Sequence, residues 1–209
     1  YFLFPLLAGG SGHHFSALNF LRRPVLWLEL ISSLRATRTS APNFAFDYCT
    51  SEIRIPPEQL AGIDLSSLVD IMNASEPVRP ETSEAFRKRF ARYGLRDSAL
   101  TVAYGLAENT LRVTDGGRVQ LAVNRERLAR GLVETHRGSS ASPQILTLPS
   151  CGTPVQGVDI AIVDPQTRQA VPAGRTGEIW IAGAGKAHGY WGRPEASRDT
   201  FHAQIAGQP

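Results

Sequence analysis

The chain has 209 residues, of which 42% are hydrophobic and 20% are charged, a balance typical of a soluble chain that buries a core as one large or two small domains. These proportions exclude wholesale disorder, collagen and a disulfide-stapled miniprotein. The net charge is only +3, and no basic stripe is interleaved with stacking aromatics, so nucleic-acid binding is not favoured. The opening apolar run is interrupted by Pro5 and covers about half of the 20 residues that a spanning helix needs, so no membrane span is expected.

The first half of the chain predicts alternating helices and strands. Residues 24–38 place Trp27, Ile31 and Leu34 at helical spacing, which indicates an amphipathic helix. Because this stripe is apolar, we expect the helix to pack against other elements of a core.

A strand, a loop, a helix and a second strand follow within a short stretch. The apolar run 68–72 and the run 99–103 are the predicted strands, and residues 80–93 form the predicted helix, with Gly94 as a C-cap. This order describes a right-handed βαβ unit of a parallel sheet. Open α/β sheets bind ligands outside the carboxyl ends of their strands. The loops NASEP (73–77) and YGLAEN (104–109) are therefore expected to lie together at a binding edge.

The pattern of the chain changes in its second half. Residues 111–150 are polar, contain Gly and Ser, and include a possible short helix at 125–130, so they are interpreted as an insertion. From about residue 155, apolar and polar residues alternate in 158–163 and again in 178–182, which predicts antiparallel hairpins. We therefore expect an α/β part at 1–110, an insertion-like segment at 111–150 and a β-rich subdomain at 151–209.

Cysteine usage favours a reducing compartment. Cys49 and Cys151 are the only cysteines, and no Cys/His ligand spacing surrounds them. We expect buried free thiols in a cytoplasmic protein. Because the sequence begins at Tyr1 rather than Met, we also expect it to be an internal piece of a longer polypeptide.

YGLAEN has the residue types of a nucleotide and metal site. Tyr104 at a strand end can lay its ring on a base, Gly105 lets backbone approach a ligand, and Glu108 offers the oxygen ligand that Mg²⁺ prefers. Taken alone, the same string is more often a strand-to-helix turn in which Glu108 is a helix-start charge.

Six motifs in order resemble the adenylate-forming superfamily. They are PNFAFDYC (42–49), NASEPV (73–78), YGLAEN (104–109), SCGTPV (150–155), TGEIWIAG (176–183) and GYWGRPE (189–195). The set is most similar to fatty acyl-AMP ligases and polyketide-synthase loading domains, because Ala107 stands where other branches carry Thr or Ser and PNFAFDYC is nearly that branch's own string. The resemblance implies the large N-terminal domain of such an enzyme, with TGEIWIAG and GYWGRPE as hairpin scaffold.

The resemblance also implies a set of site residues. Glu108 would be the catalytic Mg²⁺ ligand. The implied ATP-binding residues are Asn73, Ala74, Ser75, Glu76, Tyr104, Gly105, Leu106 and Ala107. Ala74 departs from the family, which usually has Gly there, and its methyl group would narrow the approach of the adenine. Phe44, Phe46 and Cys49 would line or abut the acyl channel, although an aromatic helix start is more often plain core.

The implied activity is ATP-dependent activation of a fatty or related carboxylic acid to an acyl adenylate, for transfer to an acyl carrier protein. Residues 120–148 resemble the extra segment of this branch, which disfavours coenzyme A. The family's phosphate loop and its C-terminal Lys are missing from this sequence, so the piece alone is expected to be inactive. The alternatives are a fragment of an acyl-CoA ligase and a non-catalytic, degenerate AMP-binding module.

Overall fold

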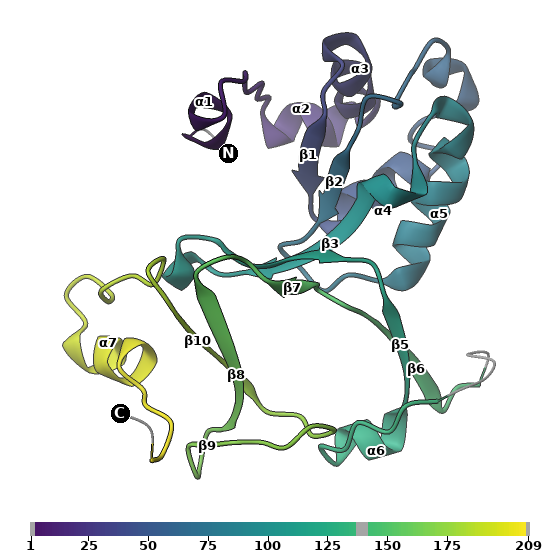
Figure 1. Cartoon of the computed structure of the whole chain (residues 1–209). Coiled ribbons are helices and arrows are strands. Elements are labelled where there is room, and N and C mark those ends of the chain that lie inside the picture. Colours follow the sequence, from purple (N-terminus) through teal and green to yellow (C-terminus); the bar gives the residue numbers. More distant parts are fainter. Residues whose placement is uncertain (1–2, 137–141, 208–209) are drawn as a thin grey trace.

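The computed structural model describes residues 3–136 and 142–207, and within them the strands form three sheets (Figure 1). The five-stranded sheet has the order β1-β2-β3-β4-β7 and comprises β1 (Arg38–Ala41), β2 (Asp70–Asn73), β3 (Leu100–Gly105), β4 (Arg112–Gly117) and β7 (Thr153–Pro154). The three-stranded sheet comprises β8 (Val158–Asp164), β9 (Gln169–Ala170) and β10 (Glu178–Gly183). The two-stranded sheet comprises β5 (Gln120–Asn124) and β6 (Ile145–Pro149).

Helices accompany these sheets along the chain. The α-helices are α1 (Leu3–Leu7), α2 (Ala17–Arg22), α3 (Val25–Leu34), α4 (Asn43–Thr50), α5 (Pro80–Phe90), α6 (Arg125–Ala129) and α7 (Pro194–Phe201). Short 3-10 turns lie at Pro57–Leu60, Ala91–Tyr93, Asp97–Ala99 and Ala107–Asn109. None of the helices described is long and apolar enough to cross a membrane.

The parallel part of the five-stranded sheet confirms the βαβ prediction. β1 pairs with β2 and β2 pairs with β3, both in parallel, and α5 lies between β2 and β3 in the chain. Asn73 at the end of β2 is in register with Val102 of β3. The loops that follow the two strands therefore leave the same edge of the sheet, as the sequence predicts.

Local sequence explains where α5 begins and ends. Pro80 occupies the first turn, where the missing N–H costs nothing, and Glu81 adds an acidic charge there. Basic residues fill the last turn, where they complement the helix dipole. The backbone then passes through a 3-10 turn to Gly94, whose φ of 86° is the left-handed cap expected from the sequence.

The helix predicted at 24–38 is shorter in the structure. α3 ends at Leu34 because Arg35 adopts a left-handed conformation with φ 47°, and the N–H of Ala36 donates to the Ile31 carbonyl at 3.0 Å. This closes the helix in the manner of a C-terminal cap. The chain then enters β1 at Arg38.

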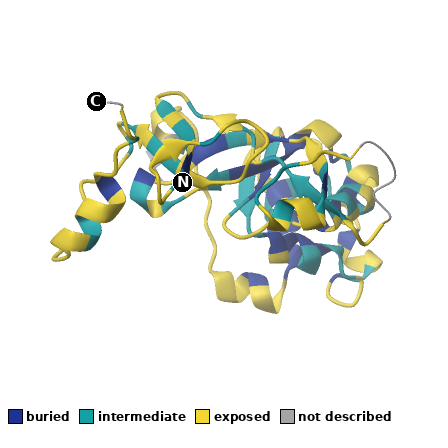
Figure 2. Cartoon of the chain, turned by 90° about the horizontal axis from the view of Figure 1, so that it is seen from below, coloured by how far each residue is buried: buried dark blue, intermediate teal, exposed yellow. Residues whose placement is uncertain are grey.

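The core lies where α3, α4 and α5 pack together on the parallel strands. In Figure 2, which colours buried residues dark blue, most of them lie in the half of the view away from the C-terminus. Trp27 of α3 contacts Phe46 of α4 with ring centroids 5.6 Å apart, and Phe46 contacts Phe86 of α5 at 4.9 Å. Phe90 continues the series one turn later, 4.5 Å from Phe86. Phe46, Phe86 and Phe90 are fully buried, so this aromatic cluster fixes α4 against α5.

The second half contains the predicted antiparallel strands. β8 pairs with β10, with Ile162 opposite Ile179. Asp164 turns the chain after β8, since its carboxylate accepts the N–H groups of Gln166 and Thr167 at 2.8 and 3.2 Å. The short helix predicted at 125–130 is confirmed as α6, with Asn124 as its N-cap.

The segment 111–150 does not form one structural unit. β4 continues the five-stranded sheet antiparallel to β3, whereas β5 and β6 form a separate two-stranded sheet, and Val123 of β5 also bridges to Thr135. β7, just beyond residue 150, returns to pair with β4. The structure thus places strands from all three predicted parts in or beside one sheet, and the domain division stays a prediction.

Candidate functional site

Tyr104 and Gly105 end β3 where it meets β4. The N–H of Tyr104 donates to the Thr114 hydroxyl at 3.1 Å, and that hydroxyl donates to the Cys151 carbonyl at 2.6 Å. A Cβ on Gly105 would lie 1.8 Å from the Leu111 carbonyl oxygen, so only glycine allows this approach. The half-buried Tyr104 is therefore held by its backbone at the sheet edge.

Glu108 lies in the 3-10 turn Ala107–Asn109 that follows β3 and is partly exposed. Its Oε1 accepts a 2.6 Å hydrogen bond from the hydroxyl of Tyr190, 82 residues further along the chain. This bond is the main reason that the pKa of the Glu108 carboxyl lies below its ordinary value. Glu108 is therefore an ionised carboxylate at neutral pH.

The loop after β2 is fixed by contacts to the end of β1 and to α4. Ser75 has φ 76°, in the left-handed region, and the N–H of Ala74 donates to the Ala41 carbonyl at 3.2 Å. The carboxylate of Glu76 accepts the N–H of Phe44 at 2.6 Å, at the first turn of α4. An acidic group at a helix N-terminus is favourable, so Glu76 anchors the loop to that helix.

A buried polar network lies beneath this loop. The Oδ1 of Asn43 accepts from Asn73 Nδ2 and from the N–H of Arg79, both at 3.1 Å. Its Nδ2 donates to the Thr82 hydroxyl at 3.2 Å. Asn43, Asn73 and Thr82 are at most 4% exposed. Asn43 therefore joins β2, α4 and the start of α5, and only Oδ1 of Asn73 in this set has no hydrogen-bond partner.

We expect Asn43→Ala to destabilise the protein by about 1–3 kcal/mol, because it leaves buried donors and acceptors on Asn73, Arg79 and Thr82 without partners. Urea unfolding measures the cost. Thr82→Val is the matched control, since it removes only one bond of the network. Equal losses in the two variants would contradict the central role of Asn43.

The three residues predicted to line the acyl channel differ in their surroundings. Phe46 and Cys49 are fully buried, and Phe44 is 38% exposed. Burial raises the pKa of the Cys49 thiol to about 12, so it stays protonated and is no nucleophile at neutral pH. Cys151 is also free but is exposed, which differs from the expectation that both thiols are buried. Phe44 is the member of this set that lies beside Glu76, while the other two are core residues.

The donor set at Glu108 fits a magnesium ion that is shared with substrate phosphates. Among the residues described, no group of three or more His, Cys, Asp or Glu side chains is placed to hold a metal. Mg²⁺, however, usually takes only one or two protein carboxylates and completes its shell with water and phosphate oxygens. A single ionised, partly exposed carboxylate at the sheet edge meets that requirement.

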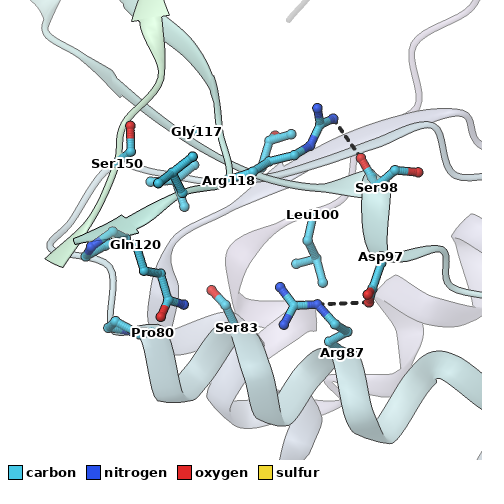
Figure 3. A pocket seen from close by; sticks show the side chains of 14 residues that line it. Pro80, Ser83, Arg87, Asp97, Ser98, Leu100, Gly117, Arg118, Gln120 and Ser150 are labelled. Atoms are coloured by element: carbon cyan, nitrogen blue, oxygen red, sulfur yellow. Dashed lines mark hydrogen bonds and ion pairs between the residues drawn. The ribbon is translucent and has the colours of Figure 1, made fainter. Parts of the chain in front are cut away.

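A separate hollow of about 290 Å³ lies between α5 and the strands β3 to β6 (Figure 3). The two arginines that line it already have partners. Nε of Arg87 lies 3.0 Å from Oδ1 of Asp97, and the guanidinium of Arg118 donates to the Ser98 carbonyl at 2.7 Å. None of the predicted site residues lines it. The hollow is therefore distinct from the edge that carries Tyr104 and Glu108.

Sequence reasoning assigned no role to Tyr190 or to Asn43. The prediction that GYWGRPE is hairpin scaffold is wrong, because the motif forms the loop before α7 and the first residues of that helix. Nothing in its spacing relates Tyr190 to Glu108, which lies 82 positions away. Asn43 lies inside PNFAFDYC, a motif in which only Phe44, Phe46 and Cys49 are predicted to have a role. An Asn at the start of a helix normally caps it, and only the structure shows that this one bonds outward to β2 and α5.

Comparison with known proteins shows the family to which the chain belongs. Residues 1–191 match the model of the family described as AMP-binding enzyme. The chain is 38% identical over 207 residues to the medium-chain-fatty-acid–[acyl-carrier-protein] ligase JamA of Moorena producens, covering 97% of this chain and 34% of that protein. It is 37% identical to the long-chain-fatty-acid–AMP ligase FadD26 of Mycobacterium marinum, covering 96% of this chain and 34% of FadD26.

A solved structure agrees in fold. The fatty acyl-adenylate ligase from L. pneumophila, in complex with acyl adenylate and pyrophosphate, superimposes with a TM-score of 0.89 and 37% identity, covering 97% of this chain and 35% of that one. The chain spans about a third of the length of the curated relatives it matches. With a family match over most of its length and these likenesses in sequence and fold, the chain belongs to the AMP-binding enzymes.

Proposed function

We propose that this chain is the central part of a fatty acyl-AMP ligase, which activates a fatty or related carboxylic acid with ATP. The observation that supports this most directly is the shared sheet edge, because β2 and β3 pair in parallel and are followed by the loops that carry residues 73–76 and 104–108. JamA and FadD26, by their names, act on medium-chain and long-chain fatty acids.

In the proposed reaction, a carboxylate oxygen of the acid attacks the α-phosphorus of ATP, and pyrophosphate leaves. The product is a mixed anhydride, the acyl adenylate. Mg²⁺ held by Glu108 would neutralise charge on the phosphates. Tyr104 would stack on the adenine, and the backbone of residues 73–76 and 105–107 would form the other walls of its pocket. Hydrogen bonds hold both loops in place, so the binding of ATP would require little reorganisation of the protein.

We assign Phe44 to the mouth of the acyl channel, with Phe46 and Cys49 supporting it from the core. Phe44 is the exposed member and its N–H is bound by Glu76, so an acyl group there would lie next to the proposed nucleotide loop.

The acceptor in this proposal is the thiol of an acyl carrier protein. It attacks the acyl carbon of the adenylate, AMP leaves, and a thioester forms.

Two assays on the full-length enzyme test this function. Fatty-acid-dependent exchange between ATP and pyrophosphate reports acyl-adenylate formation, and product analysis with a holo carrier protein and with coenzyme A reports the acceptor. We expect exchange, and thioester on the carrier only. Efficient acyl-CoA synthesis would favour an acyl-CoA ligase, and a folded protein without exchange would favour a non-catalytic module.

A further inference from the structure

The turn that carries Glu108 is clamped by a distant segment of the chain. The N–H of Ala187 donates to the Glu108 carbonyl at 2.8 Å, and the Thr110 hydroxyl donates to the Gly185 carbonyl at 2.7 Å. The Tyr190 hydroxyl makes the third contact, to the Glu108 carboxylate at 2.6 Å. The first bond holds the backbone of the turn, the second holds the side chain of Thr110 just after the turn, and only the third acts on the carboxylate.

The ring of Tyr190 is itself held in place. It packs edge to face on Phe201 of α7, with centroids 5.1 Å apart, and Phe201 is 3% exposed. The N–H of Tyr190 donates to the Ser197 hydroxyl at 2.8 Å. A Cβ on the preceding Gly189 would lie 2.8 Å from the Cβ of Ser197, so this glycine allows the segment to approach α7. The hydroxyl therefore points at Glu108 from a fixed support.

We propose that Tyr190 is a positioning residue that orients the Glu108 carboxylate toward the metal ion, an inference that rests on the proposed function. An ionised carboxylate has about four lone-pair sites, so a hydrogen bond to Oε1 leaves capacity for a cation. Partners that orient a ligand in this way commonly change metal affinity by about 10–100-fold when they are removed. α7 and the segment before it thereby contribute to the site at the end of β3.

Tyr190→Phe tests the proposal because it removes the hydroxyl and keeps the ring on Phe201. In the full-length enzyme we expect the variant to bind Mn²⁺ about tenfold more weakly than the wild type does. Both proteins are measured with ATP and without fatty acid, and the electron paramagnetic resonance signal reports the free Mn²⁺. The Mg²⁺ concentration for half-maximal exchange should rise similarly, with the fatty-acid KM unchanged. Trp191→Phe is the matched control, since Trp191 is fully exposed beside it.

The same titration on Glu108→Gln separates the inference from the function on which it rests. If Tyr190 acts through Glu108, adding Tyr190→Phe to Glu108→Gln weakens Mn²⁺ binding no further. If Tyr190→Phe binds Mn²⁺ as tightly as the wild type, or if the double variant binds it more weakly than Glu108→Gln alone, the positioning role is overturned and the proposed function stays intact. If Glu108→Gln binds Mn²⁺ as tightly as the wild type, the positioning role and the proposed role of Glu108 are both overturned.

Discussion

Glu108→Gln is expected to lower the rate of acyl-adenylate formation by about a hundredfold or more in the full-length enzyme, the scale of losing one preorganised electrostatic element. Glutamine keeps the size of the side chain and an oxygen that still accepts from the Tyr190 hydroxyl. It loses the negative charge that Mg²⁺ requires. The substitution therefore removes the charge with little change in shape, and ATP–pyrophosphate exchange measures the result.

Tyr104→Ala provides the contrast to this result. Stacking of a base on an aromatic ring contributes about 1–3 kcal/mol and is made equally in the ground state and the transition state, so its loss should raise the ATP KM and spare kcat. If Glu108→Gln had wild-type exchange in a folded enzyme, Glu108 would instead be a helix-start charge that Tyr190 holds for structural reasons.

Sequence periodicity was sufficient for the α/β part of the fold. Phe86 and Phe90 stand four apart on one face of α5, and the apolar runs on either side of that helix became β2 and β3. Once two strands are parallel neighbours, their carboxyl ends must meet, so the loops at Asn73 and Tyr104 were predictable as one edge.

Contacts between distant segments were not predictable in this way. The bond between Tyr190 and Glu108 depends on where α7 docks, and the sequence 189–195 carries no signal for that position. The network of Asn43 depends on the separation of α4 and α5, which the packing of Phe46 on Phe86 sets. Periodicity identifies which face of an element is buried, but it does not identify the partner across that face.

The described part of the segment 120–148 contacts both the loop before β10 and the start of α5. Val133 donates to the Gly174 carbonyl at 2.8 Å, and the N–H of Thr176 donates to the Gly131 carbonyl at 3.1 Å, so the segment contacts the loop before β10. Its β6 end lies against the start of α5. The arginines at 125, 127 and 130 give it a basic excess over Glu126 and Glu134, and Arg137, the fourth predicted member, lies outside the described residues. We infer that it restrains the β-rich part relative to the α/β part.

Deleting residues 121–148 should leave acyl-adenylate formation largely intact and add acyl-CoA formation, which the intact enzyme should lack. The ends of the segment are already together, since Gln120 pairs with Pro149 and the N–H of Ser150 donates to the Val119 carbonyl at 2.8 Å, so an Asn-Gly turn can join them. Tyr104 and Glu108 are untouched, whereas the restraint on Gly174 and Thr176 is lost. Arg127→Gln, which removes only the exposed pair with Glu134, is the control and should keep the wild-type acceptor. Product analysis with coenzyme A and a holo carrier protein measures the outcome. A deletion variant that still forms acyl adenylate but makes no acyl-CoA would show that residues outside this segment select the acceptor.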